Sequence, residues 1–268
     1  MRETDLINIM DRLERVEKRV GFQERLESGG GSSSYMLTYS SIPMLRGFWP
    51  CSAMNTSKLA ETLIGYHLTA DSSPKFGYSG IIPHIYLNGS SSFYYGDNAQ
   101  FDITGGSGDG ADSSSIYGIT MGLWIKPSGV SGTQFLMSKY NTASNQRSFY
   151  LTLNNDTLRF WLSQDGGTTN RDYHDSTATL STDTWYFVAA RWGASDMSVW
   201  IDDTRSDGPS SITGIYNSSA NFALGRGYDV TTQYYFTGYM AHAWISACYL
   251  SNDWVSQIYT NTKSVFGK

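Results

Sequence analysis

Carboxylates that could form a catalytic pair are scarce in most of this sequence. After Glu27 a single glutamate remains, Glu61, in a stretch without regular periodicity. Glycoside hydrolysis needs two carboxyl groups that flank the scissile bond. The nearest acidic pair, Asp202-Asp203, ends a predicted strand, where neighbouring side chains point to opposite faces. We therefore expect no catalytic residues and predict that the protein is not an enzyme.

The histidines and cysteines show no pattern typical of a metal site or of a nucleophile. The four histidines are His67, His84, His174 and His242. None of them forms the His-x-x-x-His spacing of a metal-binding helix, and His174 lies in a polar loop, where we interpret it as an ordinary surface histidine. The two cysteines, Cys51 and Cys248, cannot form a disulfide framework. We predict two buried free thiols, with a bridge between them as the alternative.

Tyrosines on predicted loops and strand ends could stack against a sugar ring. Carbohydrate binding needs aromatic platforms with polar groups beside them. Six tyrosines are candidates for such a platform: Tyr94, Tyr95, Tyr173, Tyr228, Tyr234 and Tyr235. Each is equally compatible with an ordinary strand-end aromatic or an interface residue. The residues alone leave these alternatives open.

The charge distribution argues against nucleic acid and membrane as partners. The formal net charge is −5, and the region after residue 34 has no basic cluster that could follow a phosphate backbone. No apolar run is long enough to span a bilayer. The first residues, Met1-Arg2-Glu3-Thr4-Asp5, resemble neither a signal peptide nor a transit peptide. We expect synthesis in the cytoplasm, with any release by a route such as cell lysis.

Residues 1–27 are predicted to form a coiled-coil oligomerisation helix. They carry 13 of the chain's 43 charges, and their apolar residues recur in alternating steps of three and four. The apolar stripe comes with arginines at g positions that match glutamates at e positions of a neighbouring chain, as a parallel coiled coil requires. The residues concerned are Leu6, Ile9, Leu13, Val16, Val20, Arg12, Glu17, Arg19 and Glu24. Leu at a with Ile at d favours a trimer; the alternative is an amphipathic helix packed on its own domain.

A glycine-serine linker, residues 28–34, separates this helix from a body that reads as strands, residues 35–268. Alternating runs separated by turn residues predict antiparallel sheets packed face to face. In the run 185–192 both alternating sets are largely apolar, which predicts a central strand covered on both faces or at an interface. A short helix is expected after Leu250, with Ser251 as its cap. The predicted strands are 47–51, 84–87, 92–95, 119–125, 134–140, 148–153, 158–164, 185–192, 197–201, 222–225 and 238–246.

Several phrases of the body resemble laminin-G-like, concanavalin A-like jelly-roll domains. Residues 119–127 (ITMGLWIKP) resemble the family phrase FTISAWVKP, and residues 185–191 (WYFVAAR) resemble WHHVAATY. Residues 46–52 and 198–203 are similar to the family's GYWP and VRLYVDG strands. The resemblance covers roughly residues 44–260 and implies an all-β, two-sheet antiparallel jelly-roll sandwich. Glucanases of this fold carry Glu-x-Asp-x-x-Glu on one strand, and that pattern is absent from this sequence.

Calcium, which many relatives bind through loop oxygens, is the less favoured alternative to no cofactor at all. Ser90-Ser91-Ser92 and Tyr239-Met240-Ala241-His242 stand where relatives often have acidic residues. The loop carboxylates that remain are Asp71, Asp97, Asp102, Asp109 and Asp112. We therefore expect no metal site.

A coiled coil, a flexible linker and a laminin-G-like head form an architecture similar to phage virion appendages. The resemblance implies an oligomeric virion structural protein, such as a head fibre, decoration or tail-associated protein, made in the host cytoplasm. Its expected partners are its own copies, other virion proteins, and cell-surface or environmental glycans bound by an adhesion domain. The alternative is a cellular carbohydrate-binding or adhesion module without a virion role.

Overall fold

The computed structural model describes residues 38–55, 57–79, 82–105, 117–193, 196–228 and 233–268. The chain divides into two compact units, Met1–Ser41 and Ile42–Lys268, and the second unit falls within residues 35–268, the predicted body. The predicted coiled-coil helix and linker lie outside the described residues, so both stay predictions from the sequence. None of the helices in the described part of the chain is long and apolar enough to cross a membrane.

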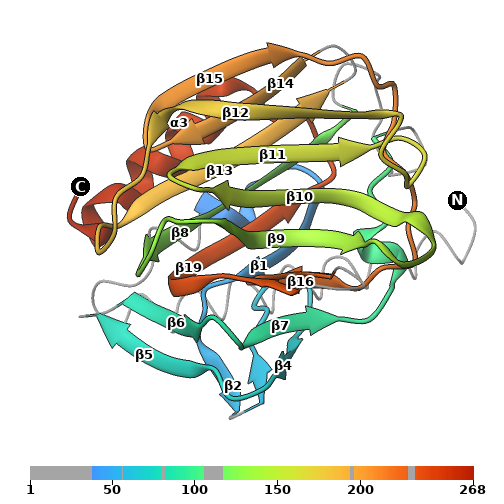
Figure 1. Cartoon of the computed structure of the whole chain (residues 1–268). Helices are drawn as coiled ribbons and strands as arrows, with labels where there is room; N and C mark the ends of the chain where they lie inside the picture. The colour runs from blue at the N-terminus through green and yellow to red at the C-terminus, as the bar shows by residue number, and fades with distance from the viewer. Residues whose placement is uncertain (1–37, 56, 80–81, 106–116, 194–195, 229–232) are drawn as a thin grey trace, which may run out of the picture. The chain divides into compact units, whose positions relative to one another are not determined.

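The body is an all-β sandwich of two sheets, as the sequence predicted (Figure 1). In the described residues the first sheet has eight strands and the second has eleven. The first contains β1 (Leu45–Trp49), β5 (Lys75–Ser79), β6 (Ile82–Asn88), β8 (Ile119–Pro127), β13 (Tyr186–Gly193), β14 (Asp196–Ile201), β15 (Thr204–Pro209) and β19 (Thr237–Ser246). The second contains β2 (Ala53–Asn55), β3 (Lys58–Leu59), β4 (Leu68–Asp71), β7 (Ser92–Tyr95), β9 (Thr133–Asn141), β10 (Gln146–Asn154), β11 (Thr157–Ser163), β12 (Arg171–Thr179), β16 (Phe222–Leu224), β17 (Arg226–Tyr228) and β18 (Gln233–Tyr235).

Strands distant in sequence are neighbours in both sheets. The first sheet runs β15-β14-β13-β8-β19-β6-β5, with β1 also paired to β19. The second runs β12-β11-β10-β9-β16-β7-β4-β3-β2. The strand β17 pairs with β18 in a hairpin and makes one parallel contact with β9. The crossing connections mean that residues from many parts of the chain meet on one face.

The hydrophobic core lies between the two sheets because alternate residues of each strand point inward. Met121 and Leu123 of β8, in the first sheet, and Leu151 and Leu153 of β10, in the second, are all fully buried in this core. Cys51 and Cys248 are buried free cysteines, which confirms the predicted thiols. Burial raises the pKa of Cys51 to about 12, so this thiol stays protonated at neutral pH.

One sheet is covered on its outside by the C-terminal helix. The helix α3 (Asn252–Thr262) is capped by Ser251, whose side chain accepts a hydrogen bond from the Trp254 N–H, as predicted. Its Tyr259 stacks on Trp124 of β8, with ring centroids 6.0 Å apart. In the described residues the 3-10 helices are η1 (Ala99–Phe101), η4 (Ala143–Asn145) and η5 (Lys263–Phe266). Because helix α3 covers the outer side of β13, where Phe187 packs against Tyr259, both faces of this strand are apolar. The strand lies between β14 and β8, which confirms that it is central.

The edge strands are where the sequence-based assignment was wrong. Residues 171–179, interpreted as a polar loop around His174, form β12 at the edge of the second sheet. Its side chains are mostly polar, and all but one are exposed or partly exposed, so the strand lacks the apolar alternation that marks a half-buried strand. Hydrogen bonding to β11, rather than burial, places it in the sheet.

Candidate functional site

A row of aromatic side chains crosses the outer face of the second sheet. Tyr150 on β10 lies opposite Trp161 on β11, and Trp161 lies opposite Tyr173 on β12. The alternating residues Leu151 and Phe160 are fully buried in the core, so the row points outward. In Figure 1 these strands lie side by side with this face toward the viewer, and no described helix lies in front of them. The outer face of this sheet is therefore a surface on which a ligand could lie.

The rings of the row pack against one another. Tyr150 and Trp161 are stacked, with centroids 5.0 Å apart and an interplanar angle of 1°. The Tyr140 ring meets both edge-on, at 5.2 Å and 5.8 Å. Burial raises the pKa of Tyr150, so its hydroxyl stays protonated and can donate a hydrogen bond. Trp161 is 2% exposed, whereas Tyr173 is 52% exposed, so a rigid aromatic base ends in a ring that is open to solvent.

Two arginines lie at the edges of this row. Arg159 makes a two-pronged ion pair with Asp175, with its Nε and Nη2 each 2.7 Å from a carboxylate oxygen. Its guanidinium also lies 4.5 Å from the centre of the Tyr173 ring. Arg147 lies 6.0 Å from the centre of the Tyr140 ring. The row thus combines apolar ring faces with charged hydrogen-bonding groups.

The hairpin of β17 and β18 carries three of the predicted tyrosines, Tyr228, Tyr234 and Tyr235, in the same sheet as Tyr94 of β7. Arg226 is 2% exposed, and its guanidinium lies 3.7 Å from the Tyr228 ring centre and 5.8 Å from that of Tyr94. It forms an ion pair with Asp71, and it is paired with Tyr235 across the hairpin. Burial raises the pKa of Tyr228, which keeps its hydroxyl protonated. Tyr94 and Tyr228 thus contact the buried Arg226 guanidinium through their rings.

The remaining predicted tyrosines have different surroundings. Tyr234 stacks on Phe135 of β9, at 5.6 Å between centroids, beside the aromatic row. Tyr95 packs against Tyr66 and Phe101 at the margin of the core, on the face of β7 opposite to Tyr94. The structure therefore groups Tyr173 and Tyr234 with the row and places Tyr95 away from it.

The sequence reasoning missed Tyr150 and Trp161, two of the three residues of the row, and Tyr140, which packs against both. A signal for Trp161 was present, because Phe160 and Leu162 on either side of it are core residues. In a strand, that alternation sends the ring between them to the outer face. Cross-strand register, which brings the three rings together, could not be derived from the strands separately.

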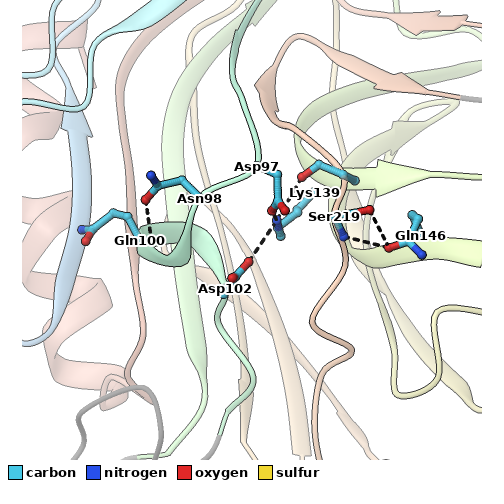
Figure 2. A network of polar contacts seen from close by, with 8 residues as sticks. Asp97, Asn98, Gln100, Asp102, Lys139, Gln146 and Ser219 are labelled. Atoms are coloured by element: carbon cyan, nitrogen blue, oxygen red, sulfur yellow. Dashed lines mark hydrogen bonds and ion pairs between the residues drawn. The ribbon is translucent and has the colours of Figure 1, made fainter.

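Protein cations occupy the carboxylates that were weighed as calcium ligands. Figure 2 shows Asp97 and Asp102 turned toward the ammonium of Lys139, at 2.6 Å and 3.1 Å. Lys139 Nζ also donates to the carbonyl of Ala220 at 2.9 Å. Asp71 is paired with Arg226. In the part of the chain that the structure describes, no three His, Cys, Asp or Glu residues are grouped to hold a metal; Asp109 and Asp112 lie outside that part.

Glu61, the single glutamate of the body, anchors a loop. Its side chain is 3% exposed, and its carboxylate accepts backbone N–H groups from Phe48, Leu63, Ile64 and Gly65. A carboxylate that accepts several backbone donors stabilises the loop conformation around it. Its role in this arrangement is structural.

The nine residues predicted for oligomerisation, Leu6, Ile9, Leu13, Val16, Val20, Arg12, Glu17, Arg19 and Glu24, lie outside the described residues. Their assignment stays a prediction from the heptad pattern.

Comparison with known families gives one match. The family model described as the concanavalin A-like lectin/glucanases superfamily matches residues 96–256, more than half of the chain. Among curated proteins no match is found.

Similar solved structures share the fold at low sequence identity. Domain 4 of AbnA, an extracellular GH43 arabinanase from Geobacillus stearothermophilus in complex with arabinotriose, is 15% identical with a TM-score of 0.57, over 80% of this chain and 98% of that one. The binding domain of botulinum neurotoxin DC in complex with rat synaptotagmin II is 11% identical, with a TM-score of 0.59, over 81% and 51%. The serotype D ligand-binding domain in complex with N-acetylneuraminic acid is 14% identical, with a TM-score of 0.57, over 85% and 52%. The chain thus spans about half the length of these neurotoxin domains.

Proposed function

The chain belongs to the concanavalin A-like lectin/glucanases superfamily, and from this membership we propose that its body is a non-catalytic module that binds carbohydrate. The aromatic row Tyr150–Trp161–Tyr173 on an outer sheet face is the observation that carries the proposal. Superfamily membership alone would not decide function, because one fold houses many activities.

The row offers the two kinds of contact that a sugar needs. The C–H face of a pyranose or furanose ring packs on an aromatic face, and the ring hydroxyls need hydrogen-bonding partners beside it. Tyr173 supplies an exposed ring, and Arg159 with Asp175 supplies donors and acceptors next to it.

Ligands named for the similar structures support the same class of partner. The arabinanase domain was solved with arabinotriose, and the serotype D domain with N-acetylneuraminic acid. The match covers 98% of the arabinanase domain but 52% of the serotype D domain, so the arabinanase domain is the stronger support for a carbohydrate ligand.

The non-catalytic part of the proposal is supported by how three of the acidic groups are used. Glu61 holds backbone N–H groups, while Asp97 and Asp102 hold Lys139. A retaining or inverting glycosidase would need two carboxyl groups free to face one sugar bond. We therefore include the absence of catalysis in the proposal.

We further propose that the body is displayed on a phage virion as part of a head fibre, decoration or tail-associated protein. The support is the sequence pattern of residues 1–34, a heptad stripe followed by a flexible linker. In that role the first 27 residues would assemble a parallel trimer and the body would adhere to cell-surface or environmental glycans. A cellular adhesion module without a virion role is the competing candidate. Genes for capsid or tail proteins beside this gene, and this chain in the mass spectrum of purified particles, would separate the two.

A glycan array probed with the full chain tests the carbohydrate proposal. We expect selective retention on a few glycans, and no release of reducing ends when those glycans are incubated in solution. Retention on none of the glycans would contradict the binding proposal. Release of reducing ends would contradict its non-catalytic part.

A further inference from the structure

A polar pocket lies on the opposite face of the sandwich from the aromatic row. Its volume is about 410 Å³, within the range of about 300–1,000 Å³ typical of small-molecule sites. Residues of β13, β14 and β15 line it together with Tyr249 and the start of helix α3. Arg191, Ser198 and Asp207 follow one cross-strand row on the outer side of the first sheet.

The floor of the pocket holds a buried guanidinium that makes no close ion pair with the described residues. Arg191 is 3% exposed, and its guanidinium lies 4.0 Å from the Tyr249 ring centre and 5.1 Å from that of Trp200. Its Nη atoms donate to the Leu250 carbonyl at 2.7 Å and to Ser198 Oγ at 3.1 Å. Its Nε has no hydrogen-bond partner among the described residues, and no carboxylate of that part of the chain is within ion-pair distance. Asp196 and Asp207 line the same pocket but act on Arg191 only from beyond ion-pair distance. A buried cation is costly unless an anion pairs with it closely, so an anion bound beside Arg191 would lower that cost.

Two further features favour an anion in the same place. The guanidinium of Arg205 lies at the pocket, held by Asp207 at 2.8 Å and 35% exposed. Helix α3 begins there, with Ser251 and Asn252 in the lining. The first N–H groups of a helix have no partner within the helix and favour negative charge.

The pocket also contains acceptors suited to hydroxyl groups. Asp196 accepts a hydrogen bond from the Tyr249 hydroxyl at 2.7 Å, and Asp207 lies beside Arg205. Burial raises the pKa of Tyr249 to about 12, so its hydroxyl is a donor at neutral pH. A purely anionic ligand such as phosphate would be repelled by two carboxylates, whereas a ligand with one anionic group and several hydroxyls matches both sets.

We propose that this pocket binds an acidic sugar, a free monosaccharide or a residue of a glycan, through its carboxylate. The carboxylate pairs with Arg191 and Arg205 near the start of α3, and the hydroxyls donate to Asp196 and Asp207. The site is separate from the aromatic row, so the body carries two sugar-binding sites on opposite faces.

Calorimetric titration of the full chain tests the proposal with glucuronic, galacturonic and N-acetylneuraminic acids, and with glucose and galactose as neutral counterparts. We expect saturable binding of at least one acid and none of its neutral counterpart. Arg205→Gln should weaken that binding at least tenfold, because it removes one of the two cations that pair with the sugar carboxylate. The Arg205 side chain is partly exposed, so its replacement leaves the buried structure intact. Arg171→Gln, an exposed arginine on β12, is the matched control and should change nothing.

The aromatic row and the pocket are distinguished by one more variant. Tyr173→Ala should leave binding of the acid unchanged, even where it abolishes binding of an array glycan. Three results would each overturn the pocket proposal. They are loss of binding of the acidic sugar in Tyr173→Ala, an equal loss of its affinity in Arg205→Gln and Arg171→Gln, and no saturable binding of any acidic sugar. None of these results would bear on whether the aromatic row binds a glycan.

Discussion

Lys139 shows how individual residues neutralise buried charge in this protein. Its side chain is completely buried, and its ammonium is held by two carboxylates and one carbonyl oxygen (Figure 2). Such a set of oxygens resembles what a hard cation requires. Here the Lys139 ammonium is the cation, and its contacts connect β9 to the segment 97–102 and to residue 220.

Lys139→Met is expected to lower the free energy of unfolding by about 2–4 kcal/mol. Breaking a buried ion pair costs about 3–5 kcal/mol because the remaining charge is unpaired, and the exposure of Asp97, 43%, reduces that cost. Urea denaturation followed by tryptophan fluorescence measures it. Lys75→Met, which removes an exposed lysine from β5, is the control and should change stability by less than about 0.5 kcal/mol. Equal stability of the two variants would show that the Lys139 network contributes little.

His242 gives the stability of the body a defined dependence on pH. Its imidazole lies between the rings of Phe48 and Phe266, and burial lowers its pKa to about 3. In the unfolded chain the pKa is about 6.5. Between these values the unfolded state binds a proton that the native state does not, so stability falls as pH falls. Its contribution is complete above about pH 6.5.

We expect the free energy of unfolding to fall from pH 6.5 toward pH 4, with His242 contributing up to about 1.4 kcal/mol per pH unit. His242→Asn keeps a residue type that tolerates the positive φ of this position, 48°. The free energy of unfolding of this variant should fall less steeply over the same range, because unfolding would take up one proton fewer. Parallel curves for the two proteins, measured by denaturation at each pH, would mean that His242 is not the responsible group.

At the scale of elements, helix α3 depends on its cap. Ser251→Ala removes the acceptor for the Trp254 N–H and is expected to cost about 1 kcal/mol, the usual value for an N-cap. Ser256→Ala, at an exposed position within the same helix, is the matched control and should be neutral or slightly stabilising. Thermal unfolding compares them, and a Ser251→Ala protein as stable as the control would argue that packing on Trp124 alone determines the helix.

The sequence predicted central strands well and edge strands poorly, for a physical reason. Strands such as β8 and β10 bury most of their residues, so their apolar runs are visible in the sequence. The strand β12 is exposed and polar, and the short β2 and β3 have only two or three residues, so neither type produces a pattern. They join the sheet through backbone pairing, which is not encoded in side-chain periodicity.

The sequence indicated individual aromatic residues but not how they are grouped. Tyr173 and Tyr234, candidates from predicted loops and strand ends, lie at or beside the aromatic row. The central residues Tyr150 and Trp161 were assigned to strands but not to a surface, because their meeting depends on the register of β10 with β11. The pocket around Arg191 depends on contacts between β13, β14 and the residues before α3, which no local pattern predicts.

At the scale of the whole molecule, the proposed parallel oligomer depends on residues 1–27. Leu13→Asp places a charge at an a position of the predicted heptads and should convert the oligomer to monomers. Lys18→Asp, at a solvent-facing position of the same heptads, should leave the oligomer intact. Light scattering coupled to size-exclusion chromatography gives the mass of each. An unchanged mass for Leu13→Asp would place assembly in the body.

The central claim is that the outer sheet face of the body binds a glycan through the row Tyr150–Trp161–Tyr173. Its most direct test is the affinity of the best array glycan for three proteins, measured by isothermal titration. Tyr173→Ala removes the exposed ring of the row, and Tyr78→Ala removes a tyrosine that is 70% exposed on β5 of the other sheet. We predict that Tyr173→Ala weakens binding at least about fivefold, the loss expected when an aromatic anchor worth 1 kcal/mol or more is truncated. Tyr78→Ala should bind like the unmodified protein, and equal affinities for the two variants would contradict the claim.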